Sequence, residues 1–157
     1  MSGDPFVALP GAIATEGAPS HFGAPLAEQR ALAEGNAVVS LSHRGVVTVA
    51  GPDRLSWLNS MTSQQLVGLK PGESVETLLL NQQGRIEQAI RFVDDGERAW
   101  LLVDEGHADS LTEYLKRMRF ALRVEIANVT DEFAAVQAFD GGVALSALRE
   151  LGLSVVE

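Results

Sequence analysis

Residues 74–103 read SVETLLLNQQGRIEQAIRFVDDGERAWLLV, and this stretch decides the fold. Three runs rich in leucine, isoleucine, valine and aromatic residues are separated by two turn signals, at residues 81–84 and 94–96. Each turn signal ends in a glycine, which supplies the positive φ that a tight reversal needs. The stretch therefore predicts a β-meander of three antiparallel strands.

The second strand of this meander carries one amide on an otherwise apolar face. Side chains alternate along a strand, so one face comprises Ile86, Gln88, Ile90 and Phe92. Glu87 is turned to the opposite face. An isolated amide on an apolar face must find a hydrogen-bond partner or lie in a cavity, because leaving it unpaired costs about 1–3 kcal/mol. Gln88 is therefore the residue of the meander that most needs an explanation.

Helices and strands are predicted on both sides of the meander. Before it, the pattern predicts a helix over residues 26–34, β-rich runs over 37–43 and 46–51, and a helix from about residue 54 to 60. After it come a helix over 107–120, strands over 124–129 and 133–139, a helix over 143–151, and the beginning of a strand over 153–157. This order predicts an α+β fold with a mixed, largely antiparallel sheet packed on helices.

The two ends of the chain differ in composition from the middle. Residues 1–20 are rich in proline, glycine and alanine, a composition with little drive to fold alone, so we expect a flexible arm there. Residues 21–157 are expected to form the folded part.

Composition excludes several classes of protein. A chain of 157 residues with 46% hydrophobic content suits one soluble domain, and no run approaches the roughly 20 apolar residues that cross a bilayer. With no targeting pattern at the N-terminus, we expect a cytoplasmic protein without a membrane partner. The formal charge of −9 repels phosphate backbones and argues against direct nucleic-acid binding. Because cysteine is absent and the histidines lie far apart, we expect no metal site.

Few side-chain groups suggest catalysis. Two acid pairs, Asp94 with Asp95 and Asp104 with Glu105, have the composition of general acid–base or cation sites, but both sit beside glycines and are typical of turns. The serines, histidine and arginine of residues 40–44 include a nucleophile and a base, but no elbow motif surrounds either serine. The residues alone therefore predict no catalytic group.

Three segments read together resemble a known superfamily. They are SHRGVVTVAGPDR at residues 42–54, LNSMTSQQL with LKPG at 58–66 and 69–72, and LNQQGRI at 80–86. In this order and spacing they resemble the amino-terminal half of the superfamily that contains YgfZ and the aminomethyltransferase of glycine cleavage. HFGAPLAE at residues 21–28 also resembles the entry segment of actinobacterial YgfZ-type members.

This resemblance implies a folate-binding scaffold, a ring of three subdomains around a cavity that takes tetrahydrofolate. The transferase branch moves a one-carbon unit from a protein-bound aminomethyl group to that cofactor. The YgfZ branch has lost the reaction and supports iron–sulfur enzymes and, in some bacteria, tRNA modification. The residues that the resemblance places on the folate side are Leu80, Asn81, Gln88, Val103 and Asp104.

Two departures from the family pattern bear on the branch. Where the transferase has adjacent aspartates after the meander glycine, this chain has Gln88 and Ala89, which favours the YgfZ branch. YgfZ-type proteins carry a lysine-glycine-cysteine signature in the second half of a longer chain, and this chain has no cysteine. We therefore expect either the amino-terminal part of a YgfZ-like domain, incomplete at its C-terminus, or a reduced relative.

Three functions remain open at this point. The first is a tetrahydrofolate-binding YgfZ-type protein without a classical active site, with iron–sulfur client proteins as partners. Its cavity would be completed by the missing C-terminal half or by a partner chain. The second is a folate-dependent aminomethyl or methyl transferase that uses another acid. The third is a non-catalytic protein-binding module that has lost folate recognition.

Overall fold

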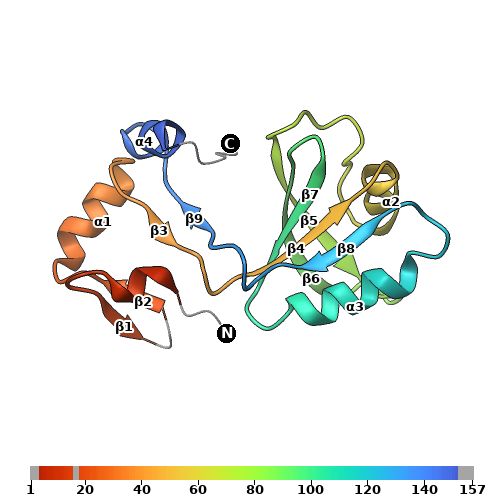
Figure 1. Cartoon of the computed structure of the whole chain (residues 1–157), viewed down its shortest axis with the longest axis horizontal. Helices are drawn as coiled ribbons and strands as arrows, with labels where there is room; N and C mark the ends of the chain where they lie inside the picture. The colour runs from red at the N-terminus through yellow and green to blue at the C-terminus, as the bar shows by residue number, and fades with distance from the viewer. Residues whose placement is uncertain (1–3, 16–17, 152–157) are drawn as a thin grey trace. The chain divides into compact units, whose positions relative to one another are not determined.

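The structure, a computed structural model, describes residues 4–15 and 18–151, which fall into two compact units. One unit comprises residues 44–130 and is called the sheet unit here. The other, the terminal unit, combines the described residues up to His43 with those from Asp131 onward. Figure 1 shows that the terminal unit is assembled from the two ends of the colour scale, red to orange and blue.

The sheet unit is built on five antiparallel strands. In spatial order they are β5 (Ser74–Leu80), β6 (Ile86–Asp94), β7 (Arg98–Val103), β4 (Gly45–Ala50) and β8 (Glu125–Asn128). The predicted meander is confirmed as β5–β6–β7. Strand β4 precedes the meander in sequence but lies between β7 and β8 and pairs with both.

Side chains within the turns hold both reversals of the meander. Asn81 Oδ1 accepts the backbone N–H groups of Gln83 at 3.0 Å and Arg85 at 2.9 Å, and Gly84 adopts a φ of 75°. In the second turn, Asp95 Oδ1 accepts two backbone N–H groups in the same way. The turn signals of the sequence therefore act through local hydrogen bonds.

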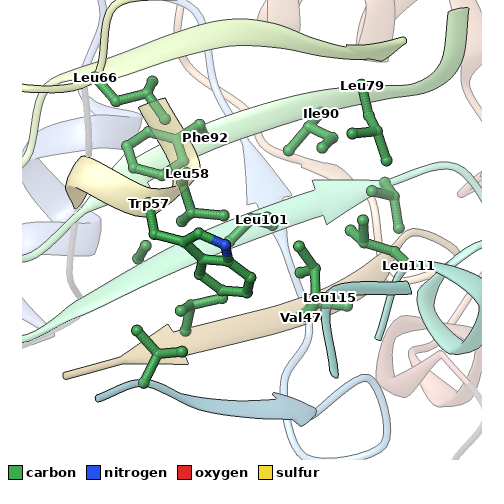
Figure 2. Packing of buried hydrophobic residues seen from close by; sticks show 14 of the residues in the cluster. Val47, Trp57, Leu58, Leu66, Leu79, Ile90, Phe92, Leu101, Leu111 and Leu115 are labelled. Carbon is green, nitrogen blue, oxygen red and sulfur yellow. The ribbon is translucent and has the colours of Figure 1, made fainter. Parts of the chain in front are cut away.

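Two helices supply the hydrophobic residues that pack on one face of the sheet. They are α2 (Arg54–Met61) and α3 (Ala108–Met118), close to the helices predicted at these places. The cross-strand register aligns Leu101 of β7 with Val47 of β4 and with Phe92 of β6, so these side chains share a face. Figure 2 shows this face together with the helix residues of the same buried cluster, which include Trp57, Leu58, Leu111 and Leu115.

The core face of α3 also carries a buried threonine. Thr112 is 4% exposed, and its hydroxyl has no hydrogen-bond partner among the residues that the structure describes. Replacing it by valine keeps the β-branched shape and removes the unpaired hydroxyl. We expect Thr112→Val to raise the free energy of unfolding by about 1 kcal/mol, measured by urea denaturation.

Thr77 of β5 offers the matched control. It is 1% exposed, but its Oγ1 accepts the backbone N–H of Gln64 at 3.2 Å. Thr77→Val should therefore lower the free energy of unfolding by about 1 kcal/mol, because it leaves that buried donor unpaired. Equal losses in the two variants would show that the Thr112 hydroxyl is satisfied after all.

The terminal unit contains short elements that pair the two ends of the chain. They are a 3-10 helix (Pro5–Ala8), β1 (Ile13–Thr15), β2 (Ala18–His21), α1 (Pro25–Ala33), β3 (Val39–Ser40), β9 (Val136–Gln137) and α4 (Ala144–Glu150). Strands β1 and β2 form one antiparallel pair, and β3 and β9 form another. Ala144, at 7% exposure, is the one buried hydrophobic residue among those described in this unit.

The α+β class with an antiparallel sheet packed on helices is confirmed, and several boundaries differ. The strands expected over 37–43 and 133–139 shrink to the two-residue pair β3 and β9. The described part of the expected arm, residues 1–20, contains the 3-10 helix, β1 and the start of β2. These elements do not measure motion, so its flexibility stays a prediction. The strand expected over 153–157 lies outside the described residues.

Candidate functional site

The residues predicted to face folate all belong to the sheet unit. Leu80 ends β5, Asn81 begins the turn, Gln88 lies in β6, Val103 ends β7 and Asp104 follows it. Strands β6 and β7 run antiparallel, with Arg91 opposite Leu102, so the beginning of β6 lies beside the segment that leaves β7. The fold therefore brings Gln88 next to the connection between β7 and α3.

Gln88 has hydrogen-bond partners at the beginning of α3. Its Oε1 lies 2.9 Å from Nδ1 of His107, and its Nε2 lies 3.4 Å from Oγ of Ser110. Gln88 is half-buried, between exposed residues toward the turn and the fully buried Ile90 and Phe92. The amide on the apolar face is thus paired with polar groups of the covering helix.

Asp104 lies on the connection to α3 and is largely exposed. Its carboxylate is 3.4 Å from a guanidinium nitrogen of Arg44, with side-chain exposures of 68% and 35%. An ion pair this exposed contributes little to stability because water screens it. The backbone carbonyl of Asp104 accepts the N–H of His107 at 3.1 Å, which links the carboxylate to the residues that hold Gln88.

An exposed apolar pair lies on the Gln88 face toward the turn. Leu80 and Ile86 are cross-strand partners that are 40% and 61% exposed, after an irregularity in the ladder at Leu79. Ile86 shares its face with Gln88 by strand alternation. Large apolar side chains on a surface next to hydrogen-bonding groups are a common composition for ligand sites.

The other two predicted residues have structural roles. Val103 is completely buried in the sheet core, so a ligand could meet it only through its main chain. The side-chain oxygen of Asn81 is occupied by the two turn hydrogen bonds. The polar groups that remain for a ligand at this end of the sheet come from Gln88, Asp104 and two residues of α3.

Those two residues, His107 and Ser110, were not predicted as site residues. They begin the helix predicted over 107–120, so the helix was visible in the sequence. Their contact with Gln88 was not, because it depends on how α3 crosses the sheet. The available signal was the exception on the Gln88 face, since a helix that covers an amide must supply polar partners.

The acid pair at residues 94 and 95 is part of the scaffold. Arg54 donates from Nε and Nη2 to the two carboxylate oxygens of Asp94, at 2.7 and 2.9 Å. This hydrogen bond with Asp94 raises the pKa of the Arg54 guanidinium. Partial burial acts to raise the pKa of Asp95, but hydrogen bonds from Trp100 Nε1 and two backbone N–H groups outweigh it and lower that pKa. Both carboxylates are thereby held ionised as structural partners, as the turn interpretation predicts.

A second ion pair joins the beginning of α2 to the loop before β8. Arg123 donates from its side chain and its backbone N–H to Asp53, at 2.9–3.2 Å. The side-chain hydrogen bond of Arg123 lowers the pKa of Asp53. Neither residue belongs to the cluster around Gln88, so these shifted pKa values mark structural contacts.

The serine and histidine residues at 40–44 do not form a nucleophile–base pair. Ser40 donates its hydroxyl to Oδ2 of Asp4 at 2.6 Å and lies 2.8 Å from the hydroxyl of Ser42. In the described part of the chain, His43 makes no hydrogen bond to either serine. This cluster ties the N-terminal segment to β3 within the terminal unit.

The terminal unit contains a half-open apolar groove of about 410 Å³. Its lining includes Phe6, Phe22 and Leu32 together with His21 and Glu28. The Glu28 carboxylate is occupied, because it accepts the backbone N–H groups of Phe22 and Ala24, and these hydrogen bonds lower its pKa. The HFGAPLAE segment therefore forms a local cap on α1, and the groove offers mainly apolar contacts.

Two searches of the described residues gave negative results. No group of three or more histidine, cysteine, aspartate or glutamate side chains is placed to hold a metal ion. None of the helices in the described ranges is long and apolar enough to cross a membrane.

Comparison with known proteins gives a consistent family match. The family model of the GCVT N-terminal domain matches residues 12–152. A probable aminomethyltransferase from Natronomonas pharaonis is 26% identical over 143 residues, which cover 88% of this chain and 40% of that protein. A mitochondrial iron–sulfur cluster assembly factor IBA57 homolog from Mycosarcoma maydis is 27% identical over 117 residues, covering 66% of this chain and 29% of that protein.

A solved structure shares the fold. The glycine cleavage system aminomethyltransferase T from Bartonella henselae superposes with a TM-score of 0.64 at 20% sequence identity, covering 91% of this chain and 40% of that one. This chain thus spans about 40% of the length of the first relatives it matches.

Proposed function

Because this chain belongs to the family of the GCVT N-terminal domain, we propose that it is a cytoplasmic tetrahydrofolate-binding protein of the YgfZ type, which supports iron–sulfur enzymes or tRNA modification. The pairing of Gln88 carries this proposal. Gln88 stands where the resemblance places an aspartate in the transferase branch, and its amide is bound to His107 and Ser110. A neutral amide cannot serve as the acid that positions the folate amine.

The relatives bear on both branches. The Mycosarcoma maydis relative is named as an iron–sulfur cluster assembly factor, which supports the YgfZ-type function. The relatives from Natronomonas pharaonis and Thermoanaerobacter are named as aminomethyltransferases, which supports the second candidate, a folate-dependent aminomethyltransferase. In that case another acid must act. Glu87 is exposed and turned away from Gln88, and Asp104 is paired with Arg44.

Completion of the site by further polypeptide is part of the proposal. The chain spans about 40% of the first relatives, and the terminal unit leaves large apolar side chains exposed, such as Val143 at 67% and Leu151 at 74%. We propose that a C-terminal half or a partner chain covers such surfaces and completes the folate cavity. Iron–sulfur client proteins would be further partners. A protein-binding module without folate recognition, the third candidate, would share these surfaces but would not respond to the cofactor.

Calorimetric titration with folinic acid, a stable tetrahydrofolate derivative, tests the proposal. We expect weak saturable binding to this chain, with a Kd in the range of about 0.1 to 1 mM, because the cavity is incomplete. Leu80→Asp should weaken binding about tenfold, since it places a like charge beside the anionic ligand. Glu76→Gln, on the opposite face of the same strand, is the matched control. Absence of heat at millimolar ligand, in this chain and in the longest product of its gene, would refute folate binding.

Methylene transfer separates the two folate-dependent candidates. We expect no transfer to tetrahydrofolate by the wild type, because no acid occupies the position of Gln88. Gln88→Asp restores a carboxylate there without the rest of a transferase site, so we expect it to be inactive as well. Transfer by the wild type would establish the aminomethyltransferase candidate instead.

A further inference from the structure

The hydrogen bonds around Gln88 form a closed ring whose directions can be assigned. Ser110 Oγ lies 2.9 Å from the backbone carbonyl of His107, to which only the hydroxyl proton can be donated. The serine oxygen must then act as an acceptor toward Gln88. The group of Gln88 that faces Ser110 is therefore its NH₂ group, at 3.4 Å, and its carbonyl oxygen faces His107.

This orientation determines the tautomer of the imidazole. Gln88 Oε1 has no proton to give, so the 2.9 Å contact requires a proton on Nδ1 of His107. A neutral histidine with a proton on Nδ1 carries its lone pair on Nε2. His107 is exposed, and its Nε2 makes no hydrogen bond within the described part of the chain. The ring of hydrogen bonds thus presents one oriented acceptor to solvent.

We propose that His107 Nε2 is the hydrogen-bond acceptor of a ligand subsite at this end of the sheet, with Gln88 as the positioning residue that holds the imidazole. The subsite would take a flat heterocycle with ring N–H or amino donors. This inference rests on the proposed folate function and gives the acceptor role, which an aspartate would otherwise have, to a neutral imidazole.

The surroundings of His107 agree with that class of ligand. Ile86 is two residues from Gln88 on the same face, about 7 Å along the strand, and is 61% exposed beside Leu80. These apolar side chains provide a surface on which a planar ring can lie. The carboxylates near the beginning of α3 have other partners: Asp104 pairs with Arg44, and Asp109 accepts from Asn128 at 2.7 Å. The oriented acceptor beside the apolar pair is therefore His107.

Nitrogen–proton correlation spectra of the imidazole groups in the full chain test the tautomer without any ligand. We expect His107 with its proton on Nδ1. His21 provides an internal control of opposite sign, because its Nδ1 accepts the backbone N–H of Gly23 at 3.0 Å and its proton must lie on Nε2. Gln88→Leu should abolish the Nδ1 preference of His107, and Gln88→Glu, which keeps an acceptor oxygen, should retain it. A wild-type His107 protonated on Nε2, or a tautomer unaffected by Gln88→Leu, would overturn the inference.

Titration of the same sample with folinic acid tests the ligand half. We expect a shift of the His107 Nε2 resonance on binding, and a Kd raised about threefold to tenfold by His107→Leu but unchanged by His43→Leu. Binding that leaves Nε2 unshifted would overturn this inference and leave the proposed function standing. A spectrum with no change at any residue would overturn the proposed function and the ligand half together, while the tautomer result is read from the free protein.

Discussion

Asp94→Ala is expected to lower the free energy of unfolding of the sheet unit by about 3–5 kcal/mol. Asp94 and Arg54 have side-chain exposures of 4% and 13%, and they are joined by two hydrogen bonds at 2.7 and 2.9 Å. Removing the carboxylate leaves a guanidinium charge in a poorly hydrated place without its counter-ion. Asp94 also accepts the N–H of Gly96, so the β6–β7 turn loses a contact as well.

Urea denaturation followed by tryptophan fluorescence measures this loss, because Trp57 and Trp100 both lie in the sheet unit. The double variant Arg54→Leu with Asp94→Leu should recover part of it, since two apolar residues leave no charge unpaired. Glu76→Ala breaks an exposed pair with Arg91, 3.8 Å apart, and should change the free energy of unfolding by less than about 1 kcal/mol. Equal effects of Asp94→Ala and Glu76→Ala would refute the argument from burial.

Gly51→Ala is expected to cost about 3–5 kcal/mol, from two separate causes. Gly51 joins β4 to α2 with a φ of 110°, a conformation that side chains with a Cβ rarely adopt. A Cβ at this position would also overlap the backbone carbonyl oxygen of Arg123, which cannot move aside as the end of a side chain can. The loss would be a large fraction of the 5–15 kcal/mol that stabilises a typical domain.

Gly68→Ala separates the two causes. Gly68 has a φ of 99°, and a Cβ there would meet nothing within 4 Å. It should therefore show the conformational cost alone, about 1–3 kcal/mol, measured by the same denaturation. If Gly51→Ala were no more harmful than Gly68→Ala, the approach of the β8 segment to Gly51 would not contribute to stability.

Most of the sheet unit could be predicted from local patterns. The meander depends on two turns whose hydrogen bonds join residues at most four positions apart, such as Asn81 to Arg85. Helix α3 has a strong apolar stripe, of which Leu111 and Leu115 are fully buried. The position of β4 between β7 and β8 was not predictable, because neither partner is its neighbour in sequence.

The candidate site divides in the same way. Strand alternation placed Gln88 on the face that α3 covers, and the need for partners followed from the chemistry of an amide. The identity of those partners, His107 and Ser110, depends on the packing of a helix 19–22 residues away. The folate contacts expected from the family resemblance stay predictions.

By itself, the sequence determined the meander, the helices, the α+β class and the family, because turns, periodicity and ordered motifs act over short distances along the chain. Only the tertiary structure decided how β4 enters the sheet, how the two ends of the chain pair through β3 and β9, and which groups hold Gln88. The reason is physical: a hydrogen bond or ion pair forms between groups that packing brings within about 3 Å, and their distance along the chain does not reveal it.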